Sequence, residues 1–454
     1  MPIRSEFRTL TRLALPIISA NLGWMAIQFV DTLMVGRYSD EALAAVALAA
    51  TWISGTLFLG VGIVMGMDPI VTQAHGARNG ERLALALQRG LVLAVACGVV
   101  IGALWCGTEP FLLMAGQDPE LAAIAGRYTL VQLPSAPAFL IYSALRQYLQ
   151  GREILRPIVW VVLVANVSNA LLNWMFIYGN LGCPELGVQG AGLATMLTRC
   201  MMPIVLIVII RSGKLHHGAW VRWSRAALRW SGIRELLRLG IPSGIQTSLE
   251  MWAFGAAALM AGHLGKDEIA AHAIVINLAS MSFMVPLGVS AAATTRVGNL
   301  IGAGKAVQAQ TSAWCSILMG AGFMAISALI FALFRHELPR MYTQPSDINV
   351  RELSAIALPI AAAFQIFDGI QVVGSGILRG QGSTLPAAAM NLVGYWVLAL
   401  PFAWWMAFRW DMGLAGIWWG LALGLAIVAI CLLVWIRFRG PARTDLRPNL
   451  GVEG

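Results

Sequence analysis

The chain has 454 residues, of which 58% are apolar and only 12% are charged. So few charged residues cannot cover a soluble globule of this length, and the composition therefore predicts a membrane protein that is surrounded by a lipid bilayer. The net charge of +9 comes from short basic clusters between apolar segments and not from one basic stripe, which argues against a nucleic-acid partner.

In chain order, apolar windows long enough to cross a bilayer predict twelve transmembrane helices. They lie at 10–35, 43–71, 84–107, 121–145, 156–178, 187–210, 236–262, 269–298, 309–334, 351–378, 384–408 and 412–437. The basic N-terminal stretch leads into the first window without a cleavage site, so we expect this window to remain as a span. The predicted fold class is an all-α polytopic membrane protein.

Lysine and arginine gather in alternate connections between these windows. Both termini and the long connection after the sixth window lie on the basic side. Because basic residues are retained on the cytoplasmic side, we expect both termini to be cytoplasmic in a bacterial inner (plasma) membrane.

The second half of the chain repeats features of the first half at an offset of 226 residues. Matching residues at this offset include the pairs Pro16/Pro242, Gly36/Gly262, Gly62/Gly288 and Gly76/Gly302. Each half holds six spans, an even number, so both copies enter the membrane in the same sense. We therefore expect two six-helix bundles related by a pseudo-twofold axis along the membrane normal, with a cavity between them.

This repeat divides the chain into four segments. The predicted bundles cover 1–210 and 235–438, and a basic linker at 211–234 joins them. Its tryptophan and arginine content favours a helix at the inner membrane interface. The polar tail at 439–454 is expected to be disordered.

Four acidic residues fall inside predicted spans: Asp31, Asp68, Glu250 and Asp368. A charged side chain at the bilayer centre costs roughly 2.5–3.5 kcal/mol, so such residues are candidates for ion or substrate sites. Glu250 and Asp368 lie too far from the ends of their windows for a short side chain to reach water. Asp68 is near the inner end of its window, where a role at the helix end is equally consistent.

A carboxyl group in this setting supports coupled exchange in two ways. It can bind and release a proton near neutral pH, or it can remain ionised around an alkali cation, which prefers hard oxygen ligands. If the coupling ion is Na+, we expect Glu250 and Asp368 to bind it. A cationic substrate would compete for the same negative charge, so each occupant would favour a different conformation.

Neutral polar residues accompany these acids. Gln28 lies three residues before Asp31, and Gln371 lies three residues after Asp368, so each shares a helix face with its acid. In the fifth span Asn166, Asn169 and Asn173 form one polar stripe. Such a stripe fits either hydrogen bonding between helices or a binding site.

At these residues the chain resembles the multidrug and toxic compound extrusion (MATE) family, most closely its NorM-type branch. The most specific motifs are FVDTLMVG (29–36), VTQAHGARN (71–79), NWMFIYG (173–179), SLEMWAF (248–254), RVGNLIGAGK (296–305) and FDGIQVVGSGILRGQG (367–382). The resemblance implies two six-helix bundles forming a V, and export of cationic, amphipathic drugs in exchange for Na+ or H+.

The resemblance also implies roles for individual residues. Asp31, Glu250 and Asp368 match acids of the ion and substrate sites of the family, and Gln371 matches the companion of the last of these acids. Asn169 and Asn173 match asparagines of the fifth helix. Pro16 resembles a proline at which the first helix bends in some members. The sequence departs from the family at two positions. Asn173 stands where another branch has an aspartate, and Asp68 resembles an acidic position of eukaryotic members.

We therefore predict a monomeric secondary antiporter for organic cations, without a cofactor other than the coupling ion, Na+ or H+. A lipid or oligosaccharide flippase of a related superfamily is the alternative, for which a strongly cationic cavity would be expected. A membrane-embedded enzyme is disfavoured, because no catalytic motif is present and GNLIGAGK at 298–305 lacks the spacing of a phosphate-binding loop.

Overall fold

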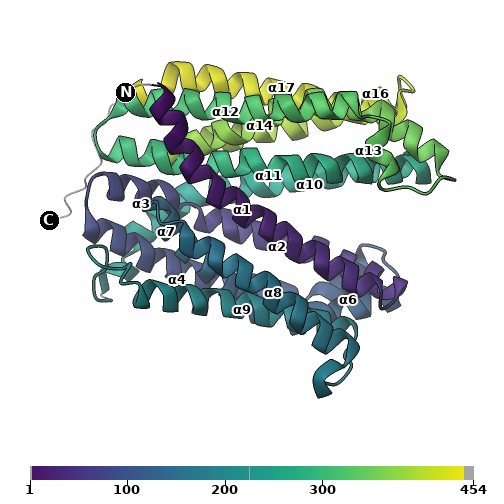
Figure 1. The fold of residues 1–454 in the computed structure, drawn as a ribbon, viewed down its shortest axis with the longest axis horizontal. Coiled ribbons are helices and arrows are strands. Elements are labelled where there is room, and N and C mark those ends of the chain that lie inside the picture. The colour runs from purple at the N-terminus through teal and green to yellow at the C-terminus, as the bar shows by residue number, and fades with distance from the viewer. Residues whose placement is uncertain (1–2, 224, 444–454) are drawn as a thin grey trace. The chain divides into compact units, whose positions relative to one another are not determined.

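The computed structural model describes residues 3–223 and 225–443, and all regular elements within these ranges are helices (Figure 1). The all-α polytopic fold with twelve spans is confirmed in this part of the chain. Most of the predicted tail, 444–454, lies outside the described residues.

The spans follow the predicted windows closely. They are α1 (Ile3–Gly36), α2 (Asp40–Val64) with α3 (Met67–Gly76), α4 (Gly80–Trp105), α6 (Pro119–Val131) with α7 (Ser135–Gly151), α8 (Arg156–Tyr178), α9 (Val188–Ser212), α10 (Trp230–Leu264), α11 (Lys266–Gly302), α12 (Ala306–Leu333), α14 (Ile348–Gln381), α15 (Thr384–Asn391) with η3 (Leu392–Ala399) and α16 (Leu400–Phe408), and α17 (Gly413–Arg439). The connections hold α5 (Thr108–Met114), α13 (Glu337–Arg340) and the 3-10 turns η1 (Asn180–Gly182), η2 (Arg225–Leu228) and η4 (Pro441–Arg443).

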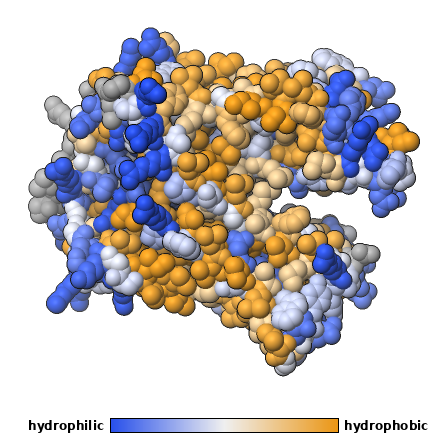
Figure 2. Space-filling view, in the orientation of Figure 1, coloured by the Kyte–Doolittle hydropathy of each residue, from blue (hydrophilic) through white to orange (hydrophobic). Residues whose placement is uncertain are grey.

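Ten of these spans are long and apolar enough to cross a membrane within the described ranges. The α6–α7 span differs because a turn ending at Pro134 interrupts it, and proline has no N–H to continue the helical hydrogen bonding. α10 differs because polar residues such as Gln246 and Glu250 lower its hydropathy. In the space-filling view, hydrophobic residues cover the middle stretches of the helices and hydrophilic residues gather toward their ends (Figure 2).

The chain forms two compact units. Unit 1 comprises Met1–Ile18, Gly76–Arg78 and Ile245–Gly454, and unit 2 comprises Ser19–His75 and Asn79–Gly244. α1 and α10 each contribute to both units, and each changes unit two residues after an internal proline, Pro16 or Pro242. The limits expected from the sequence, 1–210 and 235–438, follow the internal repeat and remain a prediction.

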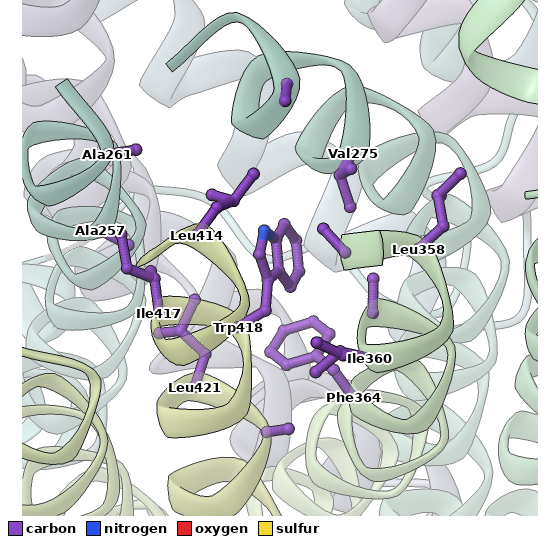
Figure 3. Packing of buried hydrophobic residues seen from close by; sticks show 14 of the residues in the cluster. Ala257, Ala261, Val275, Leu358, Ile360, Phe364, Leu414, Ile417, Trp418 and Leu421 are labelled. Atoms are coloured by element: carbon purple, nitrogen blue, oxygen red, sulfur yellow. The ribbon is translucent and has the colours of Figure 1, made fainter. Parts of the chain in front are cut away.

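Unit 1 has a core of aromatic and small residues. Trp418 of α17 packs against Phe364 of α14, with ring centroids 5.7 Å apart, and alanines of α10 and α11 belong to the same buried cluster (Figure 3). The α11–α14 contact is close because a Cβ at Gly376 would collide with the Ser290 carbonyl oxygen. The hydroxyl of Ser290 donates to the Val372 carbonyl across 2.6 Å, so this contact also carries a hydrogen bond.

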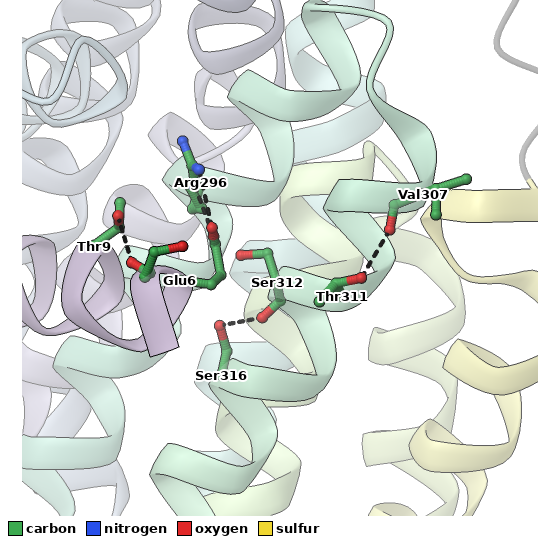
Figure 4. Close-up of polar contacts among 8 residues, drawn as sticks. Glu6, Thr9, Arg296, Val307, Thr311, Ser312 and Ser316 are labelled. Atoms are coloured by element: carbon green, nitrogen blue, oxygen red, sulfur yellow. Dashed lines mark hydrogen bonds and ion pairs between the residues drawn. The ribbon is translucent and has the colours of Figure 1, made fainter. Parts of the chain in front are cut away.

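The N-terminal turns of α1 are tied to unit 1 by an ion pair. Glu6 accepts from Arg296 Nε across 2.8 Å and from Nη2 across 3.0 Å, and only 3% of the Glu6 side chain is exposed (Figure 4). Such a bidentate pair fixes both position and orientation.

Unit 2 contains a close contact between α2 and the first part of α10. A Cβ at Gly66 or Gly240 would overlap the backbone of the facing helix, and the same holds for Gly62 and Gly244. These glycines allow the two backbones to approach more closely than larger residues would.

The linker differs from the prediction, because residues 213–223 and 225–229 form turns, irregular backbone and the short η2 instead of a continuous helix. Lys214 and Gly218 have φ angles of 51° and 71°, which are incompatible with a continuous right-handed helix. Side chains of α4 and α7 donate to backbone carbonyls of this segment, which supplies the bonding that a helix would otherwise provide internally.

Candidate functional site

The acidic residues of the predicted spans lie in two separate groups. Asp31 belongs to unit 2, and Glu250 and Asp368 belong to unit 1. Within the described residues, none of the three forms a salt bridge. Each group is therefore surrounded mainly by neutral polar and apolar side chains, as expected for carboxyl groups that remain available for a cation or a proton.

In unit 2, helices α1, α8 and α9 bring neutral donors to Asp31. Asn173 Nδ2 donates to Oδ1 of Asp31, and Thr195 Oγ1 donates to Oδ2 across 3.3 Å. Asn173 also donates to Asn169 Oδ1 across 3.2 Å, and both asparagines are fully buried. The i and i+4 spacing on α8 thus places both amides on the face toward Asp31.

Asn166, the third member of the α8 stripe, has a different role. Its Nδ2 donates to the Gly23 carbonyl of α1 across 2.9 Å and to the Val162 carbonyl of its own helix across 2.8 Å. The sequence left two interpretations of this stripe open, and the contacts of Asn166 agree with hydrogen bonding between helices. Asn173 and, through it, Asn169 are connected to the Asp31 carboxylate, and their role in a binding site remains a prediction.

Two further predicted residues lie on α1, outside the hydrogen bonds of Asp31. The side chain of Gln28 is exposed, although its backbone carbonyl accepts from the Thr32 hydroxyl across 2.9 Å. Pro16 lies inside the continuous α1 helix, near the change of unit. Their assignments remain predictions.

Asp68 occupies the first turn of α3 and is buried. The N–H groups at a helix N-terminus favour a carboxylate, which supplies a structural reason for an acid at this position. The hydrogen-bond partners of Asp31 do not include Asp68.

In unit 1, α10 and α14 bring Glu250, Asp368 and Gln371 together. Gln371 Nε2 lies 3.4 Å from Glu250 Oε2, which is a long hydrogen bond. Asp368, one turn earlier on α14, is close enough for the charge of Glu250 to act on it. Asp368 is 4% exposed, and its Oδ1 has no hydrogen-bond partner among the described residues. An unpaired buried carboxylate oxygen is costly unless it is protonated or bound by a water or a cation, so this atom is free to accept one of them.

Tyr395 was not predicted from the sequence but lies close to this pair, and Asn391, four residues earlier, is a second buried polar residue that was not predicted. Tyr395 belongs to η3, which is a π-helix, and the charges of both Glu250 and Asp368 act on its buried phenol group. The hydroxyl of Tyr395 and both side-chain polar atoms of Asn391 lack hydrogen-bond partners in the described part of the chain. Asn391 could have been noticed as an amide in an apolar span, whereas no sequence signal marks the π-helix, a geometry frequent at functional sites.

Thr195 and Arg199 are the corresponding additions in unit 2. Arg199 lies one turn after Thr195 on α9. Its positive charge acts electrostatically on Asp31, although the two residues form no salt bridge. Its guanidinium donates to Gln132 Oε1 across 3.2 Å and lies 5.9 Å from the ring centroid of Trp24. The sequence showed an arginine in the sixth span, but its partners come from three other helices and could not be anticipated.

The chemistry of the unit 1 group fits a monovalent cation or a proton. No cluster of three His, Cys, Asp or Glu residues with metal-binding geometry occurs in the described ranges. A cation at Glu250 and Asp368 would therefore need neutral oxygens, and the buried Oε1 of Gln371 and hydroxyl of Tyr395 are suitable atoms.

Comparison with known proteins places these residues in a wider context. The sequence matches the MatE family over residues 16–175 and 242–405. It is 36% identical to "Probable multidrug resistance protein NorM" of Rhizobium meliloti (strain 1021), covering 98% of this chain and 96% of that protein. It is 35% identical to "Multidrug resistance protein NorM" of Burkholderia vietnamiensis, covering 93% and 92%. A crystal structure of "eukaryotic MATE transporter AtDTX14" has the same fold, with a TM-score of 0.88 at 24% identity and 96% coverage of both chains.

Proposed function

Because the chain belongs to the MatE family, we propose that it is a secondary active antiporter that exports organic cations in exchange for Na+ or H+ by alternating access. The observation that carries this proposal is the buried Asp368 carboxylate beside Glu250, which has an oxygen without a partner. Two nearby acids that form no salt bridge within the described residues can bind a cation or a proton, and a cationic drug would compete for the same charge.

The names of the relatives support multidrug efflux as the physiological activity, since both quoted relatives are described as multidrug resistance proteins. An inward-moving cation gains about 2.3 kcal/mol per 100 mV for each charge, which suffices to drive extrusion if the two movements are coupled. We propose that the protein lies in the bacterial inner membrane as a monomer with both termini in the cytoplasm, in accord with its basic connections.

The first test is ethidium efflux from cells that express Glu250→Gln or Asp368→Asn. Each substitution keeps the size of the side chain but removes its charge, so we expect efflux to fall to background while protein abundance in the membrane stays near normal. Glu337→Gln removes one exposed acid of α13 and is the matched control, with expected wild-type efflux. Normal efflux in both Glu250→Gln and Asp368→Asn would contradict the proposal.

The second test identifies the coupling ion. Purified protein in proteoliposomes is given a Na+ gradient or a proton gradient separately, and uptake of a fluorescent cation is followed under each. Accumulation driven by only one gradient identifies the coupling ion, whereas transport that follows neither gradient would refute antiport.

The flippase alternative is weaker in this chain. An anionic headgroup would need several unpaired positive charges, whereas each candidate site has one basic residue whose charge acts on its acid, Arg199 on Asp31 and Arg379 on Glu250. The Arg199 guanidinium already donates to Gln132 and lies near the Trp24 and Phe139 rings. The acidic pair in unit 1 would instead repel an anionic substrate.

A further inference from the structure

We infer that the segment from Gly213 to Arg229, here called the strap, is a binding surface for anionic phospholipid headgroups. It connects α9, which ends at Ser212, to α10, which begins at Trp230. Because both helices are membrane spans, a connection of this length that is fixed to their ends must lie near the membrane surface.

The strap is fixed to unit 2 through its backbone. Tyr148 OH donates to the Ala219 carbonyl and Gln88 Nε2 donates to the Val221 carbonyl, both across 2.8 Å. Further along, Arg89 Nη2 donates to the Ala226 carbonyl across 3.3 Å. Side chains of α4 and α7 thus determine the path of the strap, so its exposed side chains are presented from a defined backbone.

This path separates small side chains from large ones. Ala219 and Ala227 are buried at 4% and 0% exposure, whereas the tryptophans beside them face outward. The exposed apolar side chains of the strap and the residue after it are Trp220, Trp223, Leu228 and Trp230. Tryptophan prefers the headgroup level of a bilayer, because its ring is apolar and its N–H needs a polar partner.

Exposed positive charges alternate with these rings. Arg222, Arg225 and Arg229 are all exposed, and the sequence contains no aspartate or glutamate between Glu185 and Glu235. Exposed basic residues attract the anionic lipids of the cytoplasmic leaflet, at about 1 kcal/mol for each residue near the surface. Tryptophan and arginine together favour a lipid surface over an acidic peptide, which would not require exposed tryptophans directly beside two membrane spans.

The test uses the full-length protein in mild detergent and native mass spectrometry with added phosphatidylglycerol or phosphatidylcholine. The double variant Arg222→Gln/Arg225→Gln removes two charges of the strap. The control Arg335→Gln/Arg340→Gln removes two exposed charges near α13. We expect wild type and control to retain phosphatidylglycerol over phosphatidylcholine, and the strap variant to bind phosphatidylglycerol roughly tenfold more weakly or worse. Equal loss in both variants would show a general charge effect and overturn the inference.

A second measurement locates the bound lipid. Hydrogen exchange of the strap amides is compared in nanodiscs of phosphatidylglycerol and of phosphatidylcholine. We expect slower exchange at 213–229 in phosphatidylglycerol for wild type and no difference for the strap variant. Excess inorganic phosphate should not reproduce the protection, because it lacks the membrane surface that the tryptophans require. Protection by phosphate alone, or by an acidic peptide but not by lipid, would overturn the inference.

Discussion

The side-chain amide of Gln371 donates to the carboxylate of Glu250 and so connects α14 to α10 beside Asp368. η3 joins the same region, since Trp396 Nε1 donates to the Leu249 carbonyl across 3.1 Å. α10 therefore meets α14 and η3, which are more than 80 residues further along the chain, around one acidic residue, Glu250. Its position depends on neutral donors, because no basic side chain within the described residues forms a salt bridge with it.

Gln371→Leu should impair ethidium efflux without loss of folded protein. The substitution removes the donor to Glu250, and a hydrogen bond to a charged group contributes about 1.5–3 kcal/mol. We expect the efflux rate at low substrate concentration to fall roughly tenfold or more. Gln365→Leu is the matched control, because Gln365 is equally buried on α14 but donates to the Ser282 hydroxyl. A larger defect in the control would indicate that helix packing is responsible.

Asn173→Leu and Asn166→Leu should separate function from stability in α8. Asn173 donates to Asp31, so we expect its substitution to reduce efflux strongly. Asn166 donates to backbone carbonyls, so its substitution should lower the melting temperature by a few degrees while the remaining folded protein transports normally. Fluorescence-monitored melting and efflux are measured for both variants, and identical profiles would contradict this division.

Glu6→Gln should destabilise the protein more than Glu235→Gln. Glu6 is buried in a bidentate pair with Arg296, and removal of one partner from a buried pair costs about 3–5 kcal/mol. Glu235 pairs with Arg82 across 3.1 Å, but both side chains are substantially exposed, so about 0–1 kcal/mol is expected. Thermal melting of the purified variants in detergent compares them directly, and equal shifts would contradict the assigned difference in burial.

Gly376→Ala should lower thermal stability, whereas Gly322→Ala should not. The new methyl group at Gly376 would meet the Ser290 backbone of α11, and overpacking typically costs about 1–3 kcal/mol. At Gly322 of α12 no atom lies within 4 Å of the added Cβ, and alanine favours a helix by roughly 0.5–1 kcal/mol. A stable Gly376→Ala variant would show that α11 and α14 can separate without cost.

Much of the fold was predictable because a bilayer constrains the chain strongly. Spans must be long and apolar, so each of the twelve windows matched a helical span, with ends that differ by at most seven residues. The offset of 226 residues also reappears in the helix bounds, since α2 begins at Asp40 and α11 at Lys266, and α4 begins at Gly80 and α12 at Ala306. The acids were identifiable for a related reason, because charge is rare in such windows.

The remaining features depend on contacts that local sequence does not encode. The predicted linker helix was wrong because its backbone carbonyls are satisfied by Tyr148, Gln88 and Arg89, which are distant in sequence. Tyr395 was missed because its position depends on the π-helix η3. Asn166 and Asn173 have the same sequence context, and only the facing residues of α1 distinguish their roles.

The π-helix also makes the acidic group unusually sensitive to chain length. A π-turn contains more residues than an α-turn, so deletion of one residue between Leu392 and Ala399 would allow ordinary α-helical geometry. The change from the wider π-turn to an α-turn, which advances by about 100° for each residue, would redirect the side chains between Leu392 and Ala399. Tyr395, on whose phenol group the charges of Glu250 and Asp368 act, lies in this stretch, so the register of η3 determines how its hydroxyl is presented to the two acids.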